Sequence, residues 1–311
     1  MSAEHIKFLR SFFQEATRRR PPVKNNKGEK IMIYTLENDI LKLEVSDIGG
    51  ETRSLIKKST GREYLFDGNP DWWDNISPVC FPVCGRFHND KCTIDGVDYD
   101  LMIHGFVRRN PMERVHVTNT SITHMRKADE ETKKIYPFNF EFYFTHELID
   151  NKVKVTYRVV NKDEKPMPFQ VGAHPAFKIK LGDKITLYSE KEQVSYKNLV
   201  EKLLPEESTP VDGKKITITK DLYAGNALMF TEKQLYAAGL EDENGEFIRV
   251  SFTGFPNCVF WSPNGAPFTC IEPWFGCDDL AGTDDDFRHR YCINTLLPGN
   301  EFEISYYINV L

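Results

Sequence analysis

The sequence predicts an all-β protein, an antiparallel sandwich or barrel, and three observations support this. Aromatic residues make up 13% of the 311 residues, and aromatic side chains favour strands. Beyond residue 30, hydrophobic and polar residues alternate in many short runs separated by turn-forming residues. The same region has no convincing helical periodicity apart from short turns. No low-complexity linker or repeat divides it, so we expect residues 31–311 to form one domain.

Residues 1–30 differ from the rest of the chain and predict a helical extension followed by a linker. Apolar residues fall near one helical face, and a run of three arginines and two prolines then ends the pattern. We expect an extra helix packed on the domain, with a partner-binding or targeting segment as the alternative. The apolar positions are Ile6, Leu9, Phe12, Phe13 and Ala16.

The strands begin with residues 31–36 and 41–45, which a turn at 37–39 joins into a hairpin. Residues 138–148 alternate most cleanly, which fits an antiparallel strand with one face on the core. A turn at Asp150 and Asn151 leads into a second alternating run at 153–159. The expected core face of the first run is Phe138, Phe140, Phe142, Phe144, His146 and Leu148. Further strands are expected at 185–188, 215–218, 235–240, 247–252, 259–261, 269–271 and 301–309.

Composition excludes several classes of function. The 40 basic and 46 acidic residues give a net charge of −6, which argues against a nucleic-acid binder and against a polybasic lipid-binding patch. No apolar run reaches the roughly 18 residues of a membrane helix, and the N-terminus lacks the apolar core of a signal peptide. The seven cysteines are scattered and odd in number, which favours reduced thiols in a cytoplasmic protein.

Four short segments place ionisable side chains beside glycine, proline and aromatic residues: 82–87, 104–106, 172–177 and 270–276. Glu272 follows an apolar run and precedes a proline, which places its carboxylate at the end of a buried strand. Burial would raise its pKa and make it a usable base. The alternative is a structural ion pair. His174 and His104 are candidates for an acid–base role because histidine titrates near neutral pH. The alternative is that both are histidines of the core with a purely structural role. Arg86 is either a surface cation or an anchor for sugar hydroxyls.

These segments, in this order, resemble the aldose 1-epimerase (galactose mutarotase-like) superfamily. The resemblance runs from about residue 34 to 311 and is specific because five pieces occur in register. They are Gly85-Arg86, His104-Gly105-Phe106, the Gly-Ala-His-Pro-Ala-Phe run at 172–177, Ile271-Glu272-Pro273-Trp274, and Leu296-Leu297-Pro298-Gly299 before the last strand. The resemblance implies a single-domain antiparallel β-supersandwich with its active site in a concave cleft.

The resemblance also implies roles. Glu272 would be the general base for the anomeric hydroxyl and His174 the general acid for the ring oxygen, while His104 would steady the developing charge and Arg86 would hold hydroxyls. Trp274, with Trp72 and Trp73, would offer flat apolar faces to the sugar. The family also uses an aspartate that clamps two ring hydroxyls; Asn226 lies near its expected position, and Asp242 is another possibility.

Two further patterns resemble metal sites. Cys80, Cys84, His88 and Cys92 recur every four residues, but strand spacing would separate neighbours by about 13 Å, and zinc sites favour a close cysteine pair. The acidic residues at 278–279 and 284–286 lack the spacing of a calcium loop, and we interpret them as a solvated loop, with some of these residues near the sugar. We expect no metal and no cofactor, since mutarotation needs only proton transfers.

The leading hypothesis is therefore an aldose 1-epimerase that interconverts the α and β anomers of a hexose such as galactose or glucose. The first alternative is a hexose-6-phosphate 1-epimerase, which needs extra cations at the cleft. The second is a sugar-binding protein on the same fold without turnover, and a metal-dependent enzyme using the cysteine–histidine cluster is the weakest. The candidate phosphate-binding cations are Arg53, Arg62, Arg108 and Arg109.

Overall fold

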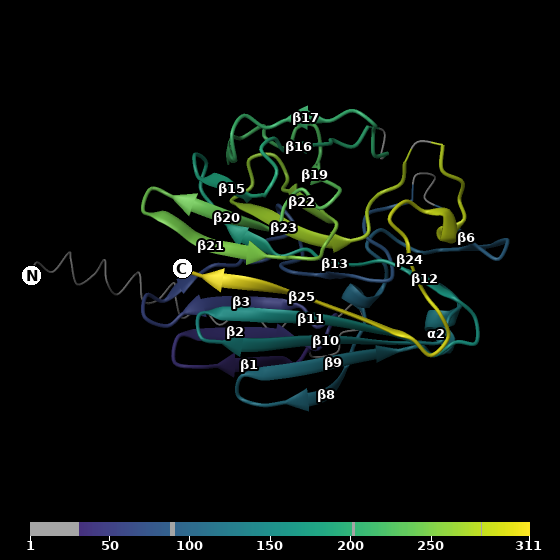
Figure 1. The fold of residues 1–311 in the computed structure, drawn as a ribbon. Coiled ribbons are helices and arrows are strands. Elements are labelled where there is room, and N and C mark those ends of the chain that lie inside the picture. The colour runs from purple at the N-terminus through teal and green to yellow at the C-terminus, as the bar shows by residue number, and fades with distance from the viewer. Residues whose placement is uncertain (1–30, 88–90, 201–202, 281) are drawn as a thin grey trace, which may run out of the picture. The chain divides into compact units, whose positions relative to one another are not determined.

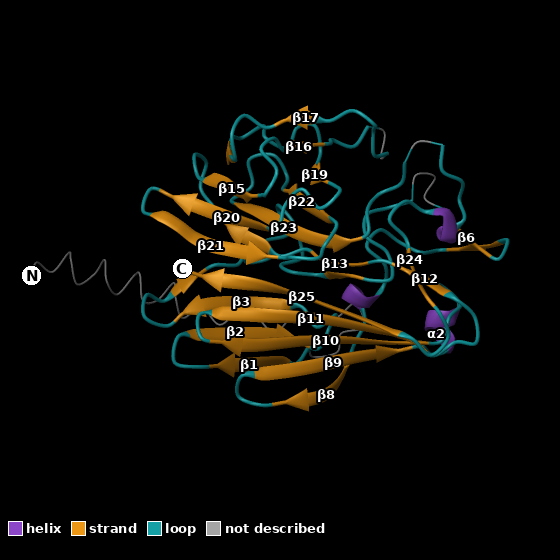
Figure 2. Ribbon diagram, viewed as in Figure 1, coloured by secondary structure: helices purple, strands orange, loops and turns teal. Residues whose placement is uncertain are grey.

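The computed structural model describes residues 31–87, 91–200, 203–280 and 282–311. Residues 33–311 form one compact unit, and nearly all of its regular structure is strand (Figure 2). The pairings between its described strands are antiparallel. The all-β antiparallel fold that the sequence predicts is thus confirmed. The expected N-terminal helix lies outside the described residues.

The largest sheet has nine strands (Figure 1). In spatial order they are β18 (Lys215–Thr217), β15 (Lys184–Tyr188), β20 (Ala237–Asp242), β21 (Gly245–Ser251), β25 (Glu301–Val310), β11 (Lys152–Asn161), β10 (Phe140–Ile149), β9 (Ser121–Lys127) and β8 (Glu113–Val117). The predicted strands at 138–148 and 153–159 become the central hairpin β10–β11, with the turn at Asp150 as expected.

Two smaller sheets accompany it. The four-stranded sheet contains β1 (Ile33–Glu37), β2 (Leu41–Ser46), β3 (Thr52–Lys57) and β4 (Arg62–Glu63). The other sheet follows the order β19 (Leu228–Phe230), β22 (Asn257–Trp261), β23 (Phe268–Phe275), β13 (Val171–Ala173) and β5 (Val79–Cys80), and β14 (Ala176–Lys178) also pairs with β23. We call this second sheet the β23 sheet.

Short elements complete the described fold. Three strand pairs stand apart from the sheets: β12 (Met167–Phe169) with β24 (Asn294–Leu296), β16 (Ser195–Tyr196) with β17 (Thr209–Pro210), and β6 (Cys92–Ile94) with β7 (Val97–Tyr99). The helical pieces are α2 (Glu130–Lys133), η1 (Val107–Arg109) and η2 (Phe287–His289). No helix in the described part of the chain is long and apolar enough to cross a membrane.

One face of the nine-stranded sheet packs against both smaller sheets. The side chains of β10 alternate between buried and partly buried positions, so Phe142 and His146 point to the same side. Phe142 stacks on Phe81, which follows β5, with ring centroids 4.5 Å apart. His146 Nε2 lies 3.0 Å from Thr52 Oγ1 in β3. The aromatic face predicted for residues 138–148 therefore forms the centre of the core.

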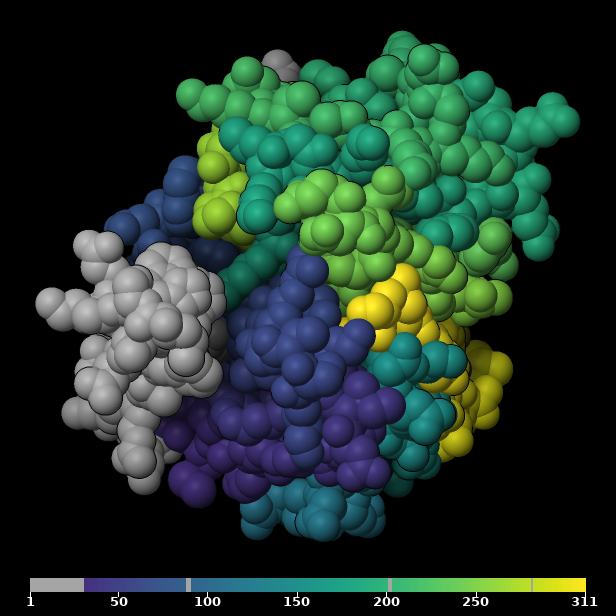
Figure 3. Space-filling view, turned by 90° about the vertical axis from the view of Figure 1, so that its left-hand side faces the viewer, coloured from purple at the N-terminus to yellow at the C-terminus, as the bar shows by residue number. Residues whose placement is uncertain are grey.

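The N-terminal strands also meet the C-terminal end of the chain. Figure 3 shows this face, where purple β1–β3, the green β20–β21 region and the yellow C-terminal segment adjoin. Lys57 Nζ donates to the Leu311 carbonyl at 2.9 Å, and Arg62 Nη1 lies 3.2 Å from Asp242 Oδ2. These contacts join the first strands of the described chain to residues that lie far from them in sequence.

Candidate active site

The strand register brings His174 and Glu272 face to face. β13 pairs with β23 so that Gly172 lies opposite Trp274, and β14 pairs with the same strand so that Ala176 lies opposite Cys270. Both pairings keep one register, which places His174, between the two strands, across from Glu272. Directly opposed residues of antiparallel strands have Cβ atoms about 5 Å apart. The two motifs therefore meet through one cross-strand position.

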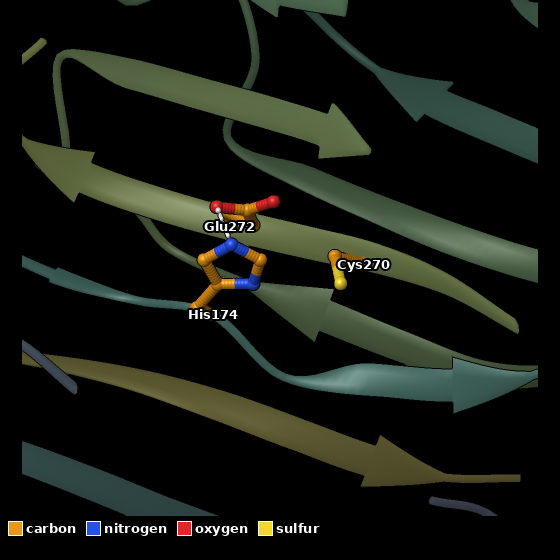
Figure 4. Close-up of side chains that lie close together, drawn as sticks. All are labelled: His174, Cys270 and Glu272. Atoms are coloured by element: carbon orange, nitrogen blue, oxygen red, sulfur yellow. Dashed lines mark ion pairs between the residues drawn. The ribbon is translucent and has the colours of Figure 1, made fainter. Parts of the chain in front are cut away.

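The pair is close and buried. His174 Nε2 lies 3.3 Å from Glu272 Oε2 (Figure 4), and the two residues are 5% and 1% exposed. Neither carboxylate oxygen of Glu272, nor Nδ1 of His174, has a hydrogen-bond partner among the described residues. Buried polar groups are nearly always satisfied, and these atoms in a cavity wall are open to hydrogen bonds from a bound ligand or water.

Aromatic rings wall in the imidazole of His174. The ring of Trp73 lies at a centroid distance of 4.7 Å, and the edge of Trp261 approaches at 5.7 Å. His104 meets the same imidazole edge-on at 5.2 Å. These rings exclude water from the imidazole and leave the cavity as its remaining open side.

Burial shifts both members of the pair toward their neutral forms. Desolvation, followed by the positive charge of Arg108, lowers the pKa of His174 to about 3. Desolvation is also the main cause that raises the pKa of Glu272 well above its usual range, with a smaller contribution from Asp278. Groups this close titrate as a unit, so one proton is shared by the pair over a wide range of pH.

His104 is held in a single orientation by the Gly85 backbone. The Gly85 N–H donates to His104 Nδ1 at 3.1 Å, and the His104 N–H donates back to the Gly85 carbonyl at 2.9 Å. Burial lowers the pKa of His104, so the ring is neutral and its proton resides on Nε2. The Gly85 contact thereby makes Nε2 a hydrogen-bond donor.

Arg86 is positioned by a buried carboxylate and a buried arginine. The Arg86 N–H donates to Asp278 Oδ1 at 2.9 Å, and its carbonyl accepts from Arg290 Nη2 at 2.8 Å. A Cβ on Gly85 would come within 2.2 Å of Asp278 Oδ1, so only glycine permits this contact. Arg290 also binds the Cys277 carbonyl and thus joins this loop to the end of β23.

The two histidines, Glu272 and Arg86 all line one cavity of about 260 Å³. Asn226 and Trp274 line the same cavity, so the structure brings together all six residues that the sequence singled out. The remaining lining residues are Trp73, Asp74, Asn75, Gly85, Ile103, Arg108, Arg109, Leu199, Ala227, Val259, Trp261 and Asp278.

Several sequence-based expectations are wrong. Asp242 does not line this cavity, because it pairs with Arg62 on another face. Trp72 is 41% exposed and is likewise not part of the cavity wall. Asp278 and Asp279 are buried rather than solvated, because the buried Arg290 lies 3.2 Å from Asp279 and the Arg86 N–H binds Asp278. Asp278 lines the cavity, whereas the loop was expected to be solvated with some of its residues near the ligand.

The expected strand-like separation between Cys80 and Cys84 is also wrong. The thiols of Cys80 and Cys84 contact one another instead of lying a strand's length apart, because β5 ends at Cys80 and a turn with a cis Phe81–Pro82 bond follows. His88 lies outside the described residues. The absence of a metal there stays a prediction.

A different set of side chains has metal-ligand character. Within the part of the chain that the structure describes, His174, Cys270 and Glu272 are the group with one ligand atom each within 4.8 Å of the others (Figure 4). Their types suit Zn²⁺. A metal ion there would occupy the lone pairs that acid–base chemistry needs, so the two uses of this site exclude one another.

Sequence reasoning missed Trp261. It alternates with Val259 along β22, and both side chains reach the cavity. The tryptophan ends a strand that pairs with the Glu272 strand, but only the pairing, which is not visible in the sequence, places it beside His174.

Comparisons with known proteins agree with this fold. A solved structure of a galactose mutarotase related enzyme from Lactobacillus acidophilus is 31% identical, with a TM-score of 0.85, and covers 90% of this chain and 97% of that one. A galactose mutarotase-like protein from Lactobacillus casei has a TM-score of 0.83 at 24% identity, with 90% and 100% coverage, and supports the fold. The chromosomal LacX protein of Lactococcus lactis is 28% identical over 299 residues, which are 90% of this chain and 100% of that protein.

The family model for aldose 1-epimerase matches residues 32–287. This span contains the described parts of all four motif segments and every residue that lines the cavity. The chain therefore belongs to the aldose 1-epimerase family.

Proposed function

We propose that this protein is an aldose 1-epimerase that interconverts the α and β anomers of a hexose by acid–base opening and closure of the ring. The observation that carries the proposal is the opposition of His174 and Glu272 in the wall of the cavity, with their atoms 3.3 Å apart. A hemiacetal has two adjacent oxygens, one that loses a proton on ring opening and one that gains a proton. A paired acid and base at this spacing matches both.

In the proposed reaction the proton shared by the pair starts on His174. Glu272, as the carboxylate, removes the proton from the anomeric hydroxyl while the imidazolium of His174 protonates the ring oxygen. The aldehyde then turns about the C1–C2 bond, and the reverse transfers close the ring on the other face. After ring opening the glutamate is protonated and the imidazole neutral, which is the distribution that burial favours for this pair. The site thus stabilises the protonation state of the open-chain intermediate.

The other lining residues have supporting roles. His104 offers its Nε2 proton near the ring oxygen, because Gly85 occupies Nδ1. Arg86 and Asn226 hold hydroxyls, and the Trp274 indole, fixed by its hydrogen bond to the Ala173 carbonyl at 3.1 Å, provides an apolar face. These proton transfers need no cofactor. The seven cysteines are free thiols, which supports a cytoplasmic location.

The alternative is a sugar-binding protein without turnover. A binding site gains little from a buried carboxylate whose oxygens accept no hydrogen bond in the described structure, since an unsatisfied buried polar group costs about 1–3 kcal/mol. In an epimerase the bound substrate would satisfy these oxygens, because the acid–base pair forms hydrogen bonds with the reacting oxygens of the sugar. We therefore favour catalysis.

Polarimetry on freshly dissolved α-D-glucose and α-D-galactose tests the proposal. Glu272→Gln and His174→Asn should each lower kcat/KM by about 10²-fold or more, the usual loss when a proton-transfer partner is removed. The matched controls Glu164→Gln and His116→Asn change exposed residues and should retain activity. Near-normal turnover in either site variant would remove that residue from the mechanism. Failure of the wild-type protein to accelerate any aldose, neutral or charged, would favour the binding protein.

A further inference from the structure

The cavity carries arginine side chains that form no ion pair within the part of the chain that the structure describes. Arg86, Arg108 and Arg109 all line it, and none forms an ion pair with a carboxylate in the described parts of the chain. The two other arginines considered from the sequence behave differently. Arg53 pairs with Glu51 at 2.6 Å, and Arg62 pairs with Asp242. Of these five arginines, the three at the cavity are the ones without an ion pair in the described structure.

Arg108 is the most constrained of the three. It lies in η1, directly after the His104 motif, and its Nη2 donates to the Ile103 carbonyl at 3.3 Å. Its Nε is buried and has no partner among the described residues. Burial and the neighbouring Arg109 lower its pKa, yet a guanidinium stays protonated. Arg108 is partly buried beside the exposed Arg109, and an anion bound to both would offset the repulsion between their charges.

The acidic groups nearby form no ion pair with Arg108 in the described structure. The charges of Asp74 and Glu51 raise its pKa, but Glu51 pairs with Arg53 at 2.6 Å. Asp278 is engaged by the Arg86 N–H and lies near the buried Arg290. Asp74 is exposed at the rim and accepts a hydrogen bond from the Asn75 side chain at 2.7 Å. Asn226 turns its Oδ1 onto the Ala227 N–H at 2.9 Å, which leaves its amide N–H groups as donors toward a ligand. The three arginines and the Asn226 amide therefore offer hydrogen-bond donors in the cavity wall.

We propose that the substrate is an anionic aldose, whose phosphate ester or carboxylate group binds Arg108 and Arg109 while its hemiacetal reaches His174 and Glu272. This inference rests on the epimerase function proposed above and names its substrate class. Arginine suits both groups, because its planar fork forms paired hydrogen bonds with phosphate and carboxylate oxygens.

An anion at this place would also assist the chemistry. The positive charge of Arg108 is one of the causes that lower the pKa of His174. A substrate anion that neutralises Arg108 weakens this repulsion, and the imidazole then holds its proton more readily. The charged group of the substrate thus both binds and prepares the general acid, which a neutral sugar does not do.

The experiment compares three aldoses of one configuration: D-galactose, D-galactose 6-phosphate and D-galacturonate, with the glucose series run in parallel. Anomer exchange is followed by NMR for each, with blanks that lack protein. At least one anionic sugar should exceed the neutral sugar in kcat/KM by about tenfold or more, the effect of one charge-assisted contact. A preference for the phosphate or for the carboxylate identifies which anion the site takes.

Arginine variants tie the preference to the site. Arg109→Gln and Arg108→Lys should each reduce the ratio of anionic to neutral kcat/KM. Arg62→Gln, a change in an ion-paired arginine elsewhere, should leave the ratio as in the wild type. Added inorganic phosphate should accelerate exchange of neutral galactose by the wild-type protein, after subtraction of the blank, and should do so less in Arg108→Lys.

The outcomes separate this inference from the proposed function. Turnover of neutral galactose equal to or faster than that of both anionic sugars overturns the anionic substrate and leaves the epimerase proposal standing. An unchanged ratio in Arg109→Gln and Arg108→Lys overturns the role of these arginines. If no sugar turns over, calorimetry decides: tighter binding of galactose 6-phosphate or galacturonate than galactose, lost in Arg109→Gln, retains the anion site, and equal binding removes it.

Discussion

At the scale of single residues, the site depends on two side chains placed where their charged forms are unfavourable. Burial raises the pKa of Glu272 and lowers that of His174 to about 3. An exposed glutamate or histidine keeps a pKa near its usual value, but here the aromatic walls and the opposing strand exclude water. The chemistry follows from this environment as much as from the residue types.

The pH dependence of turnover should reflect the shared proton. We expect a bell-shaped profile of kcat/KM, because activity requires one proton on the pair. The acid limb, where a second proton binds, should lie well below pH 6.5 because the pKa of His174 is lowered. The alkaline limb, where the last proton leaves, should lie well above 4.5 because the pKa of Glu272 is raised. A profile that rises through pH 4.5 and then stays flat to alkaline pH would instead indicate an exposed carboxylate acting alone.

At the scale of elements, the interruption between β13 and β14 creates the site. Both strands pair with β23 in the same register, but His174 and Pro175 lie between them outside any strand. Pro175 has no N–H to donate, so the ladder cannot continue through it. Its carbonyl still accepts from the Ile271 N–H at 3.2 Å, which keeps the gap in register and holds the imidazole opposite Glu272.

Gly172 tests how strictly this element must pack. A Cβ at this position would come within 2.5 Å of Trp274 Cδ1 and 2.9 Å of Cys84 Sγ. Gly172→Ala should therefore displace the indole, lower kcat/KM by about tenfold or more, and destabilise the fold by about 1–3 kcal/mol through overpacking. Tryptophan fluorescence and thermal unfolding measure the two effects. Normal turnover with an unchanged tryptophan signal would show that Trp274 tolerates the added methyl group.

At the scale of the whole molecule, a single sheet face supports two smaller sheets, and two histidines are buried in that interface. His146 bonds to Thr52, whereas His124 in β9 has no partner for either ring nitrogen in the described structure and lies near the Tyr34 ring, 6.1 Å away. Burial, followed by Arg114, lowers the pKa of His124 to about 4. Burial lowers that of His146 to about 3.

These histidines should make the fold sensitive to acid. The unfolded chain binds a proton at each histidine near pH 6.5, but the folded protein resists protonation of His124 until about pH 4. The free energy of unfolding should therefore fall as pH drops from about 6.5 to 4, by up to about 3 kcal/mol for His124. His124→Phe removes this term without leaving a bonded partner unsatisfied. Urea unfolding at pH 7 and pH 4.5 measures it, and an equal loss in variant and wild type would contradict the assignment.

The amount that sequence reasoning recovered differs between fold and site. Alternation at 138–148 identified the core face of β10 because the period of a strand is a local property. Strands β3–β9, β12–β14, β16, β17, β19 and β24 were not predicted. Most of them are short, and their pairing comes from neighbours that the sequence does not reveal. The motif segments contain five of the six selected cavity residues, and the resemblance to a family added Asn226. Local context alone left a structural alternative open for the histidines, Glu272 and Arg86.

The sequence by itself determined the strand pattern, the core face and the motif residues, because side-chain periodicity and local chemistry are written along the chain. Only the tertiary structure decided which charged groups find partners: Arg62 meets Asp242, whereas Arg108 and Arg109 face the cavity. It also placed Trp261 beside His174 and buried Asp278 under Gly85. These outcomes depend on strand register and on contacts between distant segments, and solvent exclusion, which sets the pKa values, exists only after those segments have come together.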